Sequence, residues 1–187
     1  MTTGVWYAKC EKRNDTRTPG ERHILNIQFE RIDLSNPLEV GHVICMDEEI
    51  FPEDSLDDPD YWKIPALHAY WIIADKRFVG MVAVELDRAP GDRFSDDTIE
   101  DSGTIYIISI GVREAWRGGG IGNTAKKWTY TEAPFVKGMK RIVTTVRVGN
   151  AESFALNEAH EFEAVRAIPD FYPDGEDAQL FVRSIRA

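Results

Sequence analysis

The sequence contains little of what builds a disulfide framework, a metal centre or a membrane segment. Its 187 residues include two cysteines and four histidines, and neither type shows the spacing of metal ligands. No apolar run reaches the roughly 18 residues that a membrane span needs. The first residues lack a signal-peptide apolar core followed by a cleavage site. We therefore predict a cytoplasmic protein with no metal and no membrane contact.

Positive charge is also scarce. The chain has 22 Lys and Arg against 32 Asp and Glu, so its formal net charge is −10. This charge disfavours lasting contact with nucleic-acid phosphates, and it favours a cationic small molecule or a basic peptide as partner. A role of the acidic residues in solubility alone explains the same net charge.

Strand-like and helix-like segments alternate along the chain. Period-2 and period-3.6 patterns predict strands over residues 23–32, 68–75, 78–87, 103–112, 141–148, 162–168 and 178–185, and helices over residues 38–50, 121–136 and 150–162. Pro134 lies near the end of the second helix and is expected to kink or shorten it. This order predicts a mixed α/β fold in a single domain over residues 23–187. Residues 1–22 are polar and rich in turn formers, which predicts an arm or an extra hairpin.

The segment REAWRGGGIGNTAKKW (residues 113–128) packs four glycines into five positions between a strand and a helix. Bare amides at the positive end of a helix bind phosphates. No register supplies the Gly-Lys-Ser/Thr of a P-loop. Residues 120–125 fit the dinucleotide fingerprint GxGxxA, but the strand at 141–148 ends without the acidic residue that a ribose needs. A third pattern, RxxGxG, is met by Arg117, Gly120 and Gly122.

GVREAWRGGGIGNTAKKW resembles motif A of the Gcn5-related N-acetyltransferases (GNAT), whose loop holds the pyrophosphate of acetyl-coenzyme A. VGNAESFALNEAHEFEAV resembles motif B of that family, usually NxxAxxLYxxxGF, with Asn150, Ser153, Leu156 and Phe162 at matching positions. The resemblance covers roughly residues 78–183. It implies a three-layer fold with a central, mostly antiparallel twisted sheet, flanked by helices and splayed at its central strand. It also implies transfer of acetyl from acetyl-CoA directly to a primary amine.

The resemblance further implies a set of cofactor-binding residues. The strand ends in Ile110, Gly111 and Val112. The backbone amides of Ile110 and Val112 would pair with the pantetheine arm, which would lie like an added β-strand. The pyrophosphate would lie against the backbone of Arg117, Gly118, Gly119, Gly120, Ile121 and Gly122. Asn150 and Ser153 would lie beside the pantetheine and the thiol.

The expected catalytic acid and base are missing. Asn157 stands where motif B usually has a tyrosine, and an asparagine donates a hydrogen bond without delivering a proton. Thr145 stands where the N-terminal acetyltransferase branch has a glutamate. The candidate catalytic residues are Asn157 as a hydrogen-bond donor, Tyr172 as acid and Glu85 as base. The alternatives are catalysis by proximity with water as proton carrier, or a non-catalytic acyl-CoA sensor.

The end of the chain bears on the acceptor. FYPDGEDAQLFVR resembles the ending of the ribosomal-protein alanine and related N-terminal acetyltransferases, in which a tyrosine pair lines the peptide pocket; Phe171-Tyr172 occupy those positions. A simple hairpin with a Pro-Asp-Gly turn explains it equally. Two acidic sets flank the expected cleft, one of eight residues within 47–60 and one formed by Asp170, Asp174, Glu176 and Asp177. They predict a cationic amine, or else solvated loops.

Two further expectations complete the sequence-based interpretation. A dinucleotide-binding oxidoreductase is the alternative from another class, because residues 120–125 fit its fingerprint. Members of the resembled family often pair, so a homodimer is an expected partner, although no motif here decides it.

Overall fold

The computed structural model describes residues 25–87 and 102–185. The predicted N-terminal arm at residues 1–22 lies outside them. Seven strands form one sheet in the order β1-β2-β3-β4-β5-β7-β6, and every neighbouring pair is antiparallel except β4 and β5. The strands are β1 (Ile27–Arg31), β2 (Leu67–Ala74), β3 (Arg77–Leu86), β4 (Thr104–Val112), β5 (Arg141–Arg147), β6 (Glu163–Ile168) and β7 (Ala178–Ser184). The α-helices are α1 (Pro37–Ile50), α2 (Ile121–Thr131) and α3 (Ala151–Ala159), with short 3-10 turns η1 (Tyr61–Lys63) and η2 (Glu114–Trp116).

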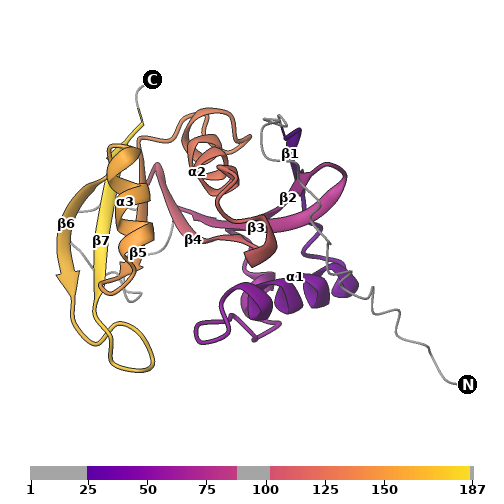
Figure 1. The fold of residues 1–187 in the computed structure, drawn as a ribbon, viewed down its shortest axis with the longest axis horizontal. Coiled ribbons are helices and arrows are strands. Elements are labelled where there is room, and N and C mark those ends of the chain that lie inside the picture. The colour runs from indigo at the N-terminus through magenta and orange to yellow at the C-terminus, as the bar shows by residue number, and fades with distance from the viewer. Residues whose placement is uncertain (1–24, 88–101, 186–187) are drawn as a thin grey trace, which may run out of the picture.

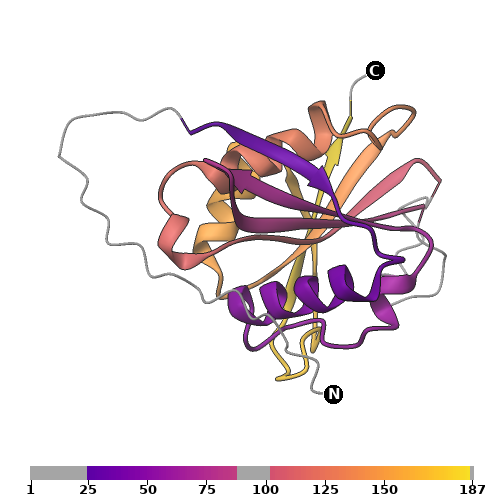
Figure 2. The same ribbon diagram turned by 90° about the vertical axis from the view of Figure 1, so that its right-hand side faces the viewer.

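The molecule has three layers. α1 lies on one face of the sheet, and α2 lies on the other (Figures 1 and 2). A large apolar cluster joins α2 and α3 to the sheet through side chains such as Ile121, Phe154 and Phe181. A second cluster joins α1 to β2 and β3. Among the described residues, no helix is long and apolar enough to cross a membrane. The predicted mixed α/β architecture is confirmed.

Helix ends follow local chemistry. α1 begins at Pro37 after Asn36, whose side chain accepts a hydrogen bond from the Leu38 amide, as an N-cap residue does. Apolar spacing predicted α2 to continue to residue 136, with Pro134 expected to kink or shorten it, and the helix is shortened: it ends at Thr131. The reason is Pro134, which has no N–H for a helical bond and disfavours helical backbone at the residue before it.

β4 makes the feature that positions the site. Its register against β3 shifts between Ala83 and Val84, which leaves Ile108 as an extra residue in a β-bulge. β4 pairs with β5 only over Thr104–Ile107 and residues 141–144. Beyond that point the two strands diverge, and none of the described strands lies beside residues 108–112 of β4 on that side. We call this opening the splay.

Candidate functional site

The open edge of β4 presents backbone donors to the splay. The Arg113 amide donates to the Val79 carbonyl at 2.9 Å, so it points toward β3. Donors alternate in direction along a strand, so the amides of Ile110 and Val112 point the other way, into the splay. These are the two amides that the sequence assigned to the pantetheine arm. Gly111, between them, has a different role, because a methyl group on it would lie 2.7 Å from Ile50 and 2.8 Å from Phe51. Its lack of a side chain lets α1 approach β4.

The glycine segment forms the turn from η2 into α2. Gly118 and Gly120 have φ of +76° and +79°, and a methyl group on either would meet nothing within 4 Å. The space before the loop is therefore open. Within residues 25–87 and 102–185, no backbone carbonyl accepts from the amides of Gly118, Gly119, Gly120, Ile121 and Gly122. Unpaired amides at a helix N-terminus form an anion site.

Arg117 is engaged inside the chain. Its amide donates to the Glu114 carbonyl at 3.1 Å, and its side-chain Nε donates to the Val112 carbonyl at 3.0 Å. The amide is thus not the free donor that the resemblance implied. The side chain instead ties the end of β4 to the start of the glycine loop, which holds the two backbone surfaces in a fixed relation.

α3 begins at the other side of the splay, after β5. The Asn150 side chain accepts a hydrogen bond from the Ser153 amide at 3.0 Å, so Asn150 is the N-cap, as predicted. The two helices that follow the diverging strands therefore both direct their positive ends toward the splay. Asn150 and Ser153 lie at this end, and their contact with a pantetheine arm stays a prediction.

Sequence reasoning missed Asn123, which follows the glycine loop in the first turn of α2. The Nε2 atom of His160 lies 2.9 Å from Oδ1 of Asn123. A carbonyl oxygen only accepts, so Nε2 carries the proton, and Nδ1 accepts from the Tyr130 hydroxyl at 2.6 Å. These two hydrogen bonds, from Tyr130 through His160 to Asn123, hold the side-chain amide of Asn123 beside the glycine loop. No sequence pattern signals this contact, because the partners are 37 residues apart.

Tyr172 lies on the β5 side of the splay. Its hydroxyl lies near the Thr145 side chain, which acts to lower its pKa, and the Arg147 guanidinium lies 4.0 Å from its ring centre. Burial, together with the nearby Asp54 carboxylate, raises the pKa of Tyr172 to about 12. The phenol is therefore neutral near pH 7 and can donate a proton or a hydrogen bond. The structure thus joins two positions that the sequence had considered separately, Tyr172 and Thr145.

The other two candidate catalytic residues lie elsewhere. Asn157 is 2% exposed, and its side chain donates to the Ser153 carbonyl at 2.8 Å, within its own helix. Glu85 is buried on β3 opposite Tyr106, two strands away from Thr145. The structure therefore does not bring Glu85 beside Tyr172.

The predicted acidic sets are largely engaged in the protein. Asp54, Asp174 and Glu176 contact Arg147, and Asp60 pairs with Lys63. Asp47 is 1% exposed, and its Oδ2 accepts from the Leu56 amide at 2.6 Å. Burial raises the pKa of the Asp47 carboxyl. The acids nearest the splay therefore have structural partners already.

Asp47 yields a prediction of pH-dependent stability. A carboxyl whose pKa is higher in the folded than in the unfolded protein favours the protonated form in the fold. Its negative charge therefore destabilises the fold as the pH rises above 3.8, the ordinary pKa of an aspartate, and through the raised pKa. Asp47→Asn keeps an acceptor for the Leu56 amide and removes this charge. We expect the variant to gain on the order of 1 kcal/mol in the free energy of unfolding at pH 8 and almost nothing at pH 4.

Urea denaturation of both proteins at the two pH values measures the difference. The matched variant Asp58→Asn removes an exposed charge and should show no such dependence. An equal gain for Asp47→Asn at both pH values would contradict the explanation by burial of charge.

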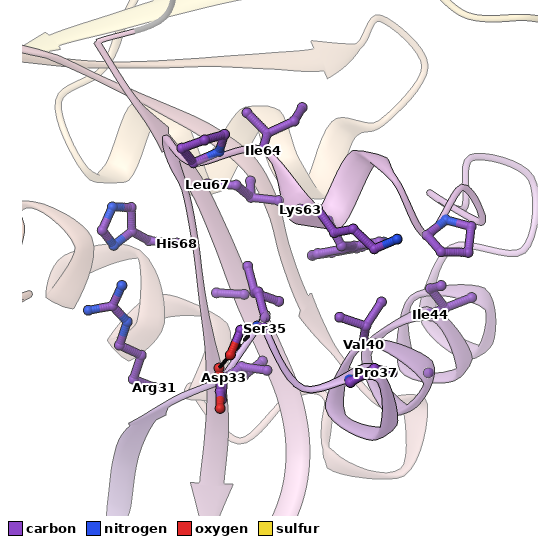
Figure 3. A pocket seen from close by; sticks show the side chains of 17 residues that line it. Arg31, Asp33, Ser35, Pro37, Val40, Ile44, Lys63, Ile64, Leu67 and His68 are labelled. Atoms are coloured by element: carbon purple, nitrogen blue, oxygen red, sulfur yellow. Dashed lines mark hydrogen bonds between the residues drawn. The ribbon is translucent and has the colours of Figure 1, made fainter.

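A separate hollow of about 830 Å³ lies at the other end of the sheet (Figure 3). It opens between the start of α1 and the residues before β2, and Pro37, Val40, Ile44, Ile64 and Leu67 supply much of its apolar lining. Leu67 is paired with Glu85, near the start of β4, whereas the splay is at the end of β4. This hollow is therefore distinct from the site at the splay.

Comparison with known proteins decides the family. Residues 37–162 match the model of the Acetyltransferase (GNAT) family. The chain belongs to the GNAT acetyltransferase family. This acyltransferase is 25% identical over 152 residues to an N-alpha-acetyltransferase of Saccharolobus solfataricus. The aligned region covers 79% of this chain and 88% of the relative.

Solved structures agree with the fold. Arabidopsis thaliana NAA60 in complex with acetyl-CoA has a TM-score of 0.68 at 19% identity, covering 86% of this chain and 99% of that one. The ribosomal-protein-S18-alanine N-acetyltransferase of Escherichia coli has a TM-score of 0.67 at 13% identity, covering 86% and 95%. The fold predicted from motifs A and B is confirmed. Residues 120–125 lie inside the matched segment, so the dinucleotide-binding alternative is replaced by this acetyltransferase family.

Proposed function

We propose that this GNAT acetyltransferase moves the acetyl group of acetyl-CoA directly to a primary amine of a basic peptide or a cationic small molecule. The observation that carries the proposal is one continuous backbone surface. The open edge of β4, with the amides of Ile110 and Val112, continues through the Arg117 tie into the amides of the glycine loop, from which no backbone carbonyl of the described residues accepts. An extended arm ending in a pyrophosphate fits such a surface.

The residues present suit acetyl-CoA. The space before Gly118 and Gly120 is open, and the positive ends of α2 and α3 favour a charged diphosphate. Acetyl-CoA supplies an acyl group activated as a thioester. A solved neighbour, NAA60, carries acetyl-CoA, which supports the same ligand here.

The chain's own residues offer part of the acid–base chemistry. Tyr172, neutral near pH 7, can donate to the leaving sulfur from the β5 side. A backbone amide on the open edge of β4 can polarise the thioester carbonyl. The carboxylates near Tyr172, those of Asp54 and Glu176, are held by Arg147, so we infer that the amine loses its proton to water. Holding the amine against the thioester then supplies much of the acceleration.

The acceptor class rests on charge and on a relative. Arg147 and the three carboxylates that it contacts carry a net charge of two negative units at the β5 side of the splay. This excess favours a positively charged acceptor. The N-alpha-acetyltransferase relative supports the α-amine of a peptide as the first amine to test.

The test has two stages. Acetyl-CoA, but not NADH or ATP, should raise the thermal midpoint, because a ligand that binds only the folded state stabilises it. Release of free thiol should then follow with peptides that have a basic N-terminal segment, compared with N-terminally blocked copies, lysine peptides and polyamines. Stabilisation without turnover on any amine would favour the acyl-CoA sensor. No stabilisation by acetyl-CoA would contradict the proposed cofactor site.

A further inference from the structure

Arg147, at the end of β5, joins two loops that are far apart in the sequence. Its Nε donates to Asp54 Oδ2 at 2.6 Å, and Nη2 also contacts the same carboxylate. Its Nη1 donates to Asp174 at 2.8 Å and to Glu176 at 2.6 Å. Asp54 belongs to the loop after α1, whereas Asp174 and Glu176 belong to the loop between β6 and β7. The Arg147 side chain is 16% exposed, so the contacts are partly shielded from water.

The same guanidinium fixes Tyr172. It lies 4.0 Å from the ring centre, close enough for a cation–π contact. The Tyr172 amide donates to the Glu176 carbonyl at 3.0 Å, and Glu176 Oε1 accepts from the Gly149 amide at 2.8 Å. The ring is therefore held from one face by Arg147 and from the backbone by Glu176. Its hydroxyl lies near the Thr145 side chain on β5.

We propose that Arg147 is a positioning residue for the acceptor: it holds the loop after α1 and the β6–β7 loop together and keeps Tyr172 in place at the β5 side of the splay. The inference rests on the proposed function. A hollow of about 430 Å³ opens along residues 168–173, beside Tyr172, where an acceptor chain can lie. Arg147 then sets the affinity for the amine and leaves the affinity for acetyl-CoA, bound on the β4 side, unchanged.

Arginine suits this position better than lysine. A guanidinium can donate to one carboxylate from two of its nitrogens and to further carboxylates from the third nitrogen. Its flat face can stack on an aromatic ring at the same time. An ammonium group is a point charge that cannot do all of these. Arg147→Lys should therefore retain charge and only part of the function.

The first experiment measures kinetic constants for the wild type, Arg147→Met and Arg147→Lys. We expect Arg147→Met to raise KM for the amine by about tenfold. Misplacing a bound group by about 1 Å can lower the efficiency of the reaction by this factor or more. KM for acetyl-CoA should stay within twofold, and Arg147→Lys should fall between the other two. Partial unfolding would lower kcat for every amine and would not move KM for the amine alone. Unchanged KM for the amine, or an equal rise in both KM values, would overturn the proposal.

Arg183→Met is the matched control. Arg183 also stacks on a tyrosine, with its guanidinium 4.3 Å from the Tyr130 ring centre, and pairs with Glu161 at 3.0 Å. It lies on β7 away from the two loops. Its loss should lower stability by a similar amount and leave KM for the amine unchanged. A rise equal to that of Arg147→Met would also overturn the proposal.

A second measurement does not depend on activity. Amide hydrogen exchange reports local opening of a segment. Arg147→Met should speed exchange in residues 51–60 and 169–177 together, and Asp54→Asn should speed exchange in 169–177 although it lies in the other loop. If the wild type acetylates no amine, the proposed function fails and this coupling still decides the role of Arg147. Faster exchange in only one loop would overturn it.

Discussion

Gly120→Ala is expected to weaken acetyl-CoA binding by about 100-fold, because each hydrogen bond to a charged group contributes about 1.5–3 kcal/mol. Gly120 has φ of +79°, and a methyl group on it would project into open space before the loop. That space is where a pyrophosphate would lie against the amides. The methyl group would hold the phosphates away from at least one donor. Titration calorimetry with acetyl-CoA measures the loss.

Gly138→Ala separates the lost contact from backbone strain. Gly138 has φ of +87°, also has nothing within 4 Å of an added methyl group, and lies beyond α2, away from the glycine loop. Both variants should lose about 1 kcal/mol of stability from forcing alanine into left-handed backbone. Only Gly120→Ala should lose affinity. Equal affinities of the two variants would show that the loop does not cradle the phosphates.

Gly80→Ala should produce the largest loss of stability, about 3 kcal/mol in the free energy of unfolding. A methyl group on Gly80 would overlap the carbonyl oxygen of Gly111 and lie 3.1 Å from its carbonyl carbon. Backbone atoms at the centre of a sheet cannot rotate away as a flexible side chain does. For a chain of this size, the thermal midpoint should fall by about 6–12 °C.

Gly41→Ala provides the opposite control. Gly41 is exposed in α1, and nothing lies within 4 Å of an added methyl group. Alanine in a helix interior is favoured over glycine by about 0.5–1 kcal/mol, so this variant should be more stable than the wild type. Calorimetry of both variants tests the contrast. A small effect of Gly80→Ala would show that β3 and β4 can separate at little cost.

Sequence patterns predicted the elements because their causes are local. The Asn36-Pro37 start of α1 and the Asn150 cap of α3 depend on neighbouring residues only. The glycine loop was recognisable because left-handed backbone at Gly118 and Gly120 demands glycine. The end of α2 was misplaced although its cause, Pro134, was visible, because apolar spacing was given more weight than the proline.

Relations across the sheet could not be read from the sequence. The bulge at Ile108 and the short pairing of β4 with β5 depend on register between distant strands. The contact of Arg147 with Asp54 joins residues 93 positions apart. The acidic sets were visible, but their count could not show that Arg147 neutralises part of them. The role of Gly111 was also missed, since its reason is the approach of α1.

The short pairing of β4 with β5 has a consequence for folding kinetics. β2, β3 and β4 form a meander, and β6 and β7 form a hairpin, so these three pairings connect neighbouring segments. The partners in β1–β2, β4–β5 and β5–β7 are each separated by other elements, and β4–β5 has the fewest paired residues of the three. β4 and β5 meet only through a crossover that includes α2, over four residue pairs. Loop-closure entropy makes such a pairing late. We therefore expect a ligand that bridges β4 and β5 to stabilise the native state and not the transition state of folding. Such a ligand slows unfolding and leaves the refolding rate nearly unchanged.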